Sequence, residues 1–209
     1  MSVLGVILAG GQATRMGGGD KGLLALGGDT ILGHVTRRLG PQVAALVLNA
    51  NGDPTRFSGL GLPVVADSIP GFAGPLAGVL AGLDHAAAQG YDRIVTAAAD
   101  TPFLPADLVA RLEAESRGQV HPLVLAATPR AAGEATRSMS QSGLVRHPTF
   151  GLWPVALRDD LRAALADGLK KVVLWTDRHG GREARFPDPE AFFNVNTPED
   201  LAQAEALLA

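Results

Sequence analysis

The chain has 209 residues, of which 46% are hydrophobic and 19% charged, and this composition is typical of a soluble globular protein. It holds no cysteine, which excludes a disulfide framework and a thiolate metal site, and its formal net charge of −3 provides no basic surface for long nucleic acids. We therefore expect one domain that binds a small anionic ligand and no nucleic acid.

Apolar runs of strand length recur along the chain up to residue 127. They cover residues 3–9, 43–49, 63–66, 93–98 and 123–127. Such continuously apolar runs are typical of strands buried on both faces, as in parallel sheets covered by helices. We predict a mostly parallel central sheet.

The first of these runs also bears on location. Residues 3–9 are far fewer than the ~20 apolar residues that a membrane span requires. No basic segment of the kind found in signal peptides precedes them. We therefore expect a cytoplasmic protein without a membrane-spanning segment.

Segments with helical periodicity lie between the apolar runs, at residues 31–39, 76–88 and 105–115. The alternation of strands and helices predicts a layered α/β fold. Near the end of the chain, Thr197, Pro198 and Asp200 supply a cap, a proline at the first helical position and an acid three residues after the cap, which predicts a final helix over 198–208. Residues 128–146 lack periodicity and are rich in small and polar residues, which predicts a mobile loop.

Polar residues follow the predicted strands at the points where they end. In a parallel sheet, ligands bind beyond the carboxyl ends of the strands, so these residues are the candidates for a site. They are Gly10, Gly11, Arg15, Lys21, Asn49, Asn51, Asp67, Asp100, Thr101 and Pro102.

The segment after the first strand is rich in glycine and carries two cations. Gly10 and Gly11 leave no Cβ between the backbone and a ligand, and backbone N–H groups in such a loop can surround phosphates. The spacing matches neither the Walker A loop nor the G-x-G-x-x-G pattern, and two glycines alone also suit an ordinary turn. Arg15 and Lys21 favour the phosphate interpretation, since a turn needs no cations, although either residue alone is more often a surface charge.

Two acids follow apolar strands. Asp100 provides the hard oxygen ligand that Mg²⁺ prefers beside a substrate phosphate, or it caps a turn into Pro102. Asp67 could bind a metal, a ribose or a base edge, or form an Asx turn with Ser68.

Further along the chain, the amides of Asn194 and Asn196 lie on one side of a short extended segment. They could bind a polar heterocycle or a metal-bound water, or serve as turn residues. His147 stands alone, and a single histidine is weak evidence for acid–base catalysis, so we assign it no catalytic role.

Taken together, these residues resemble the molybdenum cofactor guanylyltransferases, the MobA-type family of the nucleotidyltransferase group. The matching stretches occur in order along nearly the whole chain. They are Leu8-Ala9-Gly10-Gly11, Arg15-Met16-Gly17, Asp20-Lys21, Asn49-Ala50-Asn51, Asp67-Ser68, Gly74-Pro75-Leu76-Ala77-Gly78, Asp100-Thr101-Pro102, His147-Pro148-Thr149 and Asn194-Val195-Asn196-Thr197-Pro198.

The resemblance implies a fold and a reaction. The fold is a Rossmann-like three-layer sandwich of the nucleotide-diphospho-sugar transferase type. Residues 1–100 of a single domain, 1–209, would mainly bind the nucleotide, and residues 101–209, with the loop 128–146, mainly the acceptor. The reaction is transfer of GMP from GTP to molybdopterin with release of pyrophosphate and with Mg²⁺ as cofactor. Other proteins of molybdenum cofactor biosynthesis or insertion are further expected partners.

The resemblance also implies residue roles. Lys21 would contact the phosphates, and Asp100 would bind Mg²⁺. We expect Lys21, Arg15 and Asp100 to be the catalytic residues, because the charges of Lys21 and Arg15 can stabilise the leaving pyrophosphate. Asn194 and Asn196 would lie toward the pterin acceptor. The nucleotide would contact Leu8, Ala9, Gly10, Gly11, Lys21, Asn49, Asp67 and Asp100.

Alternatives remain at this point. The Leu8-Ala9-Gly10-Gly11 stretch favours guanine, because cytidylyltransferase relatives tend to have Leu-Ala-Ala-Gly. The same fold also serves enzymes that use CTP or a sugar-phosphate acceptor, and a GTP-sensing module without catalysis is a further possibility. The 128–146 segment is longer than the family's usual connection and adds Arg130, Arg137 and Arg146, which could bind an anionic pterin phosphate or a partner protein, or remain in solvent.

Overall fold

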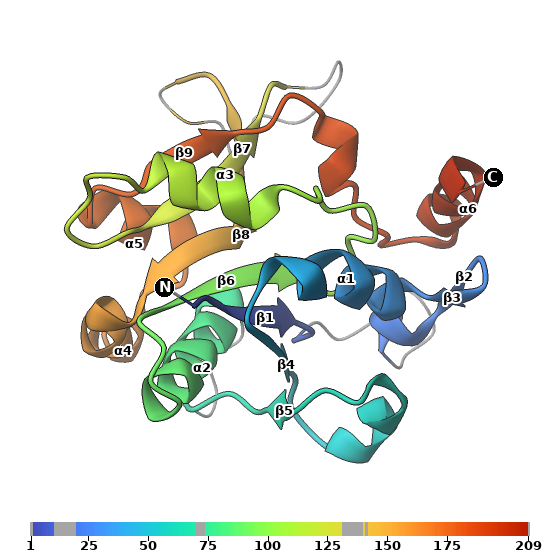
Figure 1. Ribbon diagram of the computed structural model, residues 1–209, viewed down its shortest axis with the longest axis horizontal. Coiled ribbons are helices and arrows are strands. Elements are labelled where there is room, and N and C mark those ends of the chain that lie inside the picture. The colour runs from blue at the N-terminus through green and yellow to red at the C-terminus, as the bar shows by residue number, and fades with distance from the viewer. Residues whose placement is uncertain (1, 11–19, 70–73, 131–139, 141, 209) are drawn as a thin grey trace.

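A seven-stranded sheet runs through both halves of the chain (Figure 1). The structure is a computed structural model and describes residues 2–10, 20–69, 74–130, 140 and 142–208. The strand order is β5-β4-β1-β6-β8-β7-β9. The strands are β1 (Leu4–Leu8), β4 (Ala45–Asn49), β5 (Val64–Val65), β6 (Arg93–Ala98), β7 (Val124–Thr128), β8 (Val145–Pro154) and β9 (Arg182–Arg185).

Most neighbours in the sheet are parallel. β1 pairs in parallel with β4 and β6, β4 with β5, and β7 with β9. β8 is the exception, since it runs antiparallel to both β6 and β7. The predicted mostly parallel sheet is confirmed, with one antiparallel strand added.

Helices cover both faces of this sheet, which confirms the three-layer α/β fold (Figure 1). Residues of α1 and α3 pack with one face of β1 and β6, and residues of α2, α4 and α5 pack with the other. Burial on both faces explains why β1 is apolar at every position. The helices are α1 (Ile31–Leu39), α2 (Pro75–Ala88), α3 (Leu108–Glu115), α4 (Arg158–Ala166), α5 (Val172–Arg178) and α6 (Pro198–Leu208).

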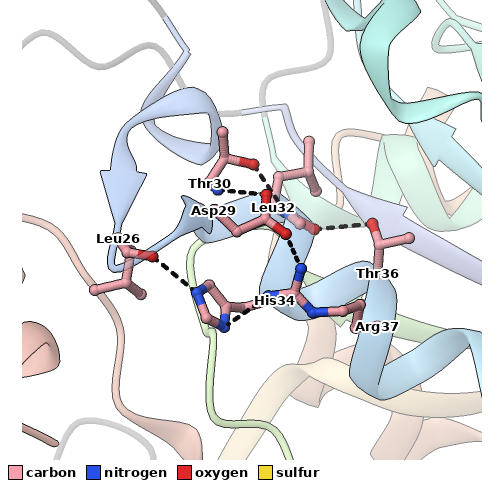
Figure 2. A network of polar contacts seen from close by, with 8 residues as sticks. Leu26, Asp29, Thr30, Leu32, His34, Thr36 and Arg37 are labelled. Atoms are coloured by element: carbon pink, nitrogen blue, oxygen red, sulfur yellow. Dashed lines mark hydrogen bonds and ion pairs between the residues drawn. The ribbon is translucent and has the colours of Figure 1, made fainter. Parts of the chain in front are cut away.

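A short hairpin leads into α1 and fixes its start. The hairpin consists of β2 (Ala25–Leu26) and β3 (Asp29–Thr30), and the Thr30 hydroxyl caps α1 by accepting a hydrogen bond from the Gly33 N–H at 3.0 Å. Figure 2 shows the His34 ring reaching back to the Leu26 carbonyl, at 2.9 Å, while Arg37 pairs with Asp29. These contacts bind the hairpin firmly to the helix that follows it.

The bounds of the final helix and of α1 agree with the sequence prediction, while α2 begins one residue earlier and α3 three residues later. In α6, the Asp200 carboxylate accepts from the Thr197 N–H at 2.9 Å and the Asp200 N–H donates to the Thr197 hydroxyl at 3.2 Å. This reciprocal pair is the predicted capping box. Figure 1 shows α6 beside the β2–β3 hairpin.

The predicted loop over 128–146 is wrong at both ends. Thr128 is the last residue of β7, and Val145 and Arg146 begin β8; residues 131–139 and 141 lie outside the described part of the chain, and Arg137 with them. The Arg146 side chain is only 13% exposed and pairs with Asp177 at 2.7 Å, so it is a structural cation of the sheet. Arg130 is exposed, in line with the solvent alternative.

Within the described residues, no helix has the length and the apolar character needed to cross a membrane.

Candidate nucleotide site

The carboxyl end of β1 lies at the point where the order of strands along the sheet reverses. β4 and β5 extend the sheet on one side of β1, and β6 extends it on the other. Such a switch point leaves a crevice beyond the strand ends, where α/β proteins bind their ligands. Leu8, the last residue of β1, is in register with Asn49 on one side and Ala98 on the other. The ends predicted to converge therefore do so.

The glycine-rich segment begins at Gly10, just beyond the carboxyl end of β1, and the described chain resumes at Asp20. Gly10 is exposed, and a Cβ built on it would meet no atom within 4 Å, so the backbone there is open to a ligand. Gly11 and Arg15 lie outside the described residues. The short helix η1 (Lys21–Leu23) follows Asp20 and begins with the lysine that was predicted to bind phosphate.

Lys21 contacts the far end of the chain. Its ammonium donates a hydrogen bond to the Asn196 side-chain oxygen at 2.8 Å, across 175 positions of sequence. It also interacts with Asp100: burial raises the pKa of the Asp100 carboxyl, and the positive charge of Lys21 opposes that rise. Three residues predicted separately from the sequence thus share one edge of the sheet.

Buried polar contacts join the segment after η6 (Pro189–Phe192) to the end of β6. The fully buried Thr101 hydroxyl donates to the Asn194 side-chain oxygen at 2.5 Å, and it lies 3.4 Å from an Asp100 carboxylate oxygen. The Val195 N–H donates to the Asp100 carbonyl at 2.9 Å. Thr101 therefore links one of the two predicted amides, that of Asn194, to the predicted metal ligand Asp100. Its position directly after Asp100 is the only sequence signal for this role.

A second polar group lies at the ends of β4 and β5. The buried Asn49 amide donates to Asp67 at 2.9 Å and to the Val65 carbonyl at 3.1 Å. Asn51 exchanges two hydrogen bonds with Asp67: its amide donates to the carboxylate at 2.7 Å, and its oxygen accepts from the Asp67 N–H at 2.9 Å. Asp67 is thus held in place by amides from the neighbouring strand end.

Gly78 in α2 is a site residue to which sequence reasoning assigned no role. A Cβ built there would lie 2.3 Å from the Asn49 side-chain oxygen and 2.9 Å from the Leu8 side chain. The missing side chain lets α2 approach the strand ends closely enough to hold Asn49.

We expect Gly78→Ala to destabilise the protein by about 1 to 3 kcal/mol, because the added methyl group must displace a buried amide. Urea unfolding measures this loss. Gly59→Ala is the control, since a Cβ at Gly59 meets nothing within 4 Å. Equal stability of the two variants would contradict the packing argument.

His147 lies half-buried in β8. Its ring stacks on Phe192 with centroids 4.2 Å apart, and its Nε2 lies 2.9 Å from the Thr128 hydroxyl. Burial lowers the pKa of His147 from its usual 6.5 to about 4. The stacked ring and the Thr128 contact give His147 a packing role in β8.

This shift predicts a pH dependence of stability. Because the folded pKa lies below the unfolded value, the folded state binds fewer protons, and stability is lost as pH falls from about 6.5 toward 4. Between pH 7.5 and pH 5 this group should remove about 2 kcal/mol of unfolding free energy. His147→Phe should flatten the profile by that amount in denaturant titrations, whereas His121→Phe, at an exposed site, should not. Parallel profiles for wild type and His147→Phe would refute the assignment.

The family model and the full-length relatives identify an α/β enzyme of the nucleotidyltransferase class. The model of the MobA-like NTP transferase domain matches residues 5–180, and the chain belongs to this family.

Relatives that match over the whole chain carry a more specific name than the family model. A molybdenum cofactor guanylyltransferase of Cereibacter sphaeroides is 51% identical over 208 residues, which cover 100% of this chain and 98% of the relative. One from a Bradyrhizobium species is also 51% identical, over 100% of this chain and 94% of the relative.

Solved structures confirm the fold. The molybdopterin-guanine dinucleotide biosynthesis protein A of Archaeoglobus fulgidus has a TM-score of 0.72 at 21% identity, over 99% of this chain and 98% of that chain. A CMP:2-keto-3-deoxy-manno-octonic acid synthetase complexed with CTP has a TM-score of 0.73 at 15% identity, over 100% of this chain and 98% of that chain.

Proposed function

We propose that this protein transfers GMP from GTP to molybdopterin and releases pyrophosphate. The observation that carries the proposal is the meeting of Lys21, Asp100 and Asn196 at one edge of the sheet, beyond the switch point. The names of the curated relatives, which match over the whole chain, support the same reaction. The product would be the guanine dinucleotide form of the cofactor, so its further partners would be proteins of cofactor biosynthesis or insertion.

The chemistry asks for charge neutralisation and alignment more than for a base. A phosphate oxygen of the pterin forms a bond to the α-phosphorus of GTP, and the bond from that phosphorus to the bridging oxygen breaks. Pyrophosphate leaves with the electron pair. The attacking phosphate monoester is already anionic near neutral pH, so positioning and fixed positive charge can supply the catalysis. Lys21 and Arg15 would neutralise the leaving pyrophosphate.

The residues present fit a Mg²⁺ ion bound together with the substrate. Mg²⁺ commonly uses one or two carboxylates and takes its other ligands from phosphate and water. Asp100 offers one carboxylate beside Lys21, and in the described ranges no cluster of three or more His, Cys, Asp or Glu residues forms an all-protein cage. When bound, Mg²⁺ would neutralise charge on the phosphate oxygens.

The remaining candidates divide into two ends of the crevice. Leu8, Ala9, Gly10, Gly11, Asn49 and Asp67 would contact the nucleotide. Asn194 and Asn196 would face the pterin acceptor, and their links to Asp100 and Lys21 would bring the acceptor phosphate next to the triphosphate. Both ends would then serve one in-line displacement.

A CTP-dependent reaction is the second candidate, because a fold neighbour with a TM-score of 0.73 was solved with CTP bound. The test is turnover with molybdopterin, Mg²⁺ and each of the four nucleoside triphosphates in turn. We expect pyrophosphate release with GTP only. Strong preference for CTP would favour the second candidate, and bound GTP without pyrophosphate release would indicate a sensor.

A further inference from the structure

Arg56 connects two separate segments of the candidate site. It lies in the short helix η3 (Pro54–Leu60), between β4 and β5, and its guanidinium pairs with Asp20 at 2.6 Å. The two terminal nitrogens donate to the backbone carbonyls of Asn51, at 2.5 Å, and Asp53, at 3.1 Å. The guanidinium also lies 4.7 Å from the ring centre of the buried Phe57. The planar fork is therefore held on several sides.

Asp20, the ion-pair partner of Arg56, directly precedes Lys21. It occupies the N-cap position of η1, where an aspartate ordinarily accepts a hydrogen bond from the first turn of its own helix. Its side chain makes no such capping bond. The carboxylate is turned instead toward Arg56, which fixes the backbone at the point where the glycine-rich segment ends and Lys21 begins.

A terminal nitrogen of Arg56 also binds the segment after β4, whose Asn51 positions Asp67. Arg56 binds the Asn51 backbone, and the Asn51 side chain makes the two hydrogen bonds to Asp67. A lysine side chain is flexible and has no fixed direction of its own, so its placement depends on its backbone. Arg56 supplies a fixed link from that backbone to the rest of the crevice.

We propose that Arg56 is a positioning residue, which acts through Asp20 to place Lys21 against the β- and γ-phosphates of the nucleotide. The inference rests on the proposed function, because it takes the triphosphate as the ligand of Lys21. Arg56 itself needs no contact with the substrate. Its loss should therefore weaken binding of a triphosphate more strongly than binding of a monophosphate, which it affects only through Asn51 and Asp67.

The test compares the dissociation constants of Mg²⁺·GTP and of GMP for wild type, Arg56→Ala and Asp20→Asn, measured by calorimetry. Arg56→Ala should weaken GTP roughly tenfold and change GMP by less than about twofold. Asp20→Asn should also weaken GTP, and the double variant should be no worse than either single one, because both break the same link. The direction of the change in GTP affinity caused by Asp20→Asn is decisive, because removal of a negative charge near the phosphates would by itself tighten GTP binding.

Arg162→Ala is the matched control, because Arg162 pairs with Asp84 at 2.5 Å on α4 and α2 and is similarly accessible. Tighter GTP binding by Asp20→Asn, GTP binding by Arg56→Ala equal to that of Arg162→Ala, or equal weakening of GTP and GMP would each overturn the proposal. The readout is nucleotide binding, so intact GTP binding without guanylyl transfer would refute the proposed function and leave this comparison valid.

Discussion

Asp100→Ala is expected to lower the rate of guanylyl transfer by about 10²- to 10³-fold, the usual loss when one group that stabilises transition-state charge is removed. Asp100 is the carboxylate at the end of β6 beside Lys21, and it is the proposed protein ligand of Mg²⁺. Steady-state release of pyrophosphate from GTP in the presence of molybdopterin measures the effect.

The fold should survive this change. Burial already raises the pKa of Asp100, which means that the environment disfavours its charged form, so Asp100→Asn should not lower the melting temperature of the ligand-free protein. Asp92→Asn is the matched control, because Asp92 lies just before β6, at the opposite end of the same strand. Turnover of Asp100→Ala near that of Asp92→Asn, with unchanged Mg²⁺ dependence, would refute the metal assignment.

Lys21→Ala should cost a similar factor, about 10²- to 10³-fold in turnover, because the ammonium would no longer neutralise the leaving pyrophosphate. Single-turnover kinetics at saturating GTP separate this loss from weaker binding. Removal of the cation also leaves Asp100 without the charge that opposes its burial, and Asn196 without its donor.

Lys170→Ala is the control for Lys21, since Lys170 is exposed and lies between α4 and α5, outside the crevice. It should behave as wild type. Wild-type turnover in Lys21→Ala would remove the lysine from the mechanism even if the protein still binds GTP.

The first half of the fold followed from the sequence because its central strands, β1 and β6, are buried on both faces. In β1 and β6 this burial gives apolar runs that no surface element shares. The sequence gives no sign of β9 (Arg182–Arg185), because this edge strand buries only the side chain of Ala184 and therefore has no apolar run. The sequence did not indicate β8 for a related reason: Val145 and Arg146 belong to the segment that was predicted to be a loop, and polar residues follow them.

The C-terminal half also contains local helix signals in its sequence. α4 has Leu161 and Leu165 four residues apart, both buried, and two acids in its first turn. A helix could have been predicted there. The α4–α5 region nevertheless gives no functional signal in the sequence, because its side chains serve the core.

The sequence could predict which candidate residues lie together where the strand order alone decides it. It could not do so where contacts between distant side chains decide it. Once the sheet is parallel, the ends of β1, β4 and β6 must share an edge, which brings Gly10, Asn49 and Asp100 into one region. The Lys21–Asn196 bond and the Arg56–Asp20 pair depend on tertiary packing across long sequence separations, and no local pattern indicates them.

The position of bond cleavage tests the central claim most directly, namely that Lys21 and Asp100 share one triphosphate. GTP labelled with ³²P at the α-phosphorus or at the γ-phosphorus can be followed through a single turnover with Mg²⁺ and molybdopterin. We predict that the α label appears in the pterin product and the γ label in pyrophosphate. Recovery of the γ label as inorganic phosphate, with the α label left in GDP, would contradict this account.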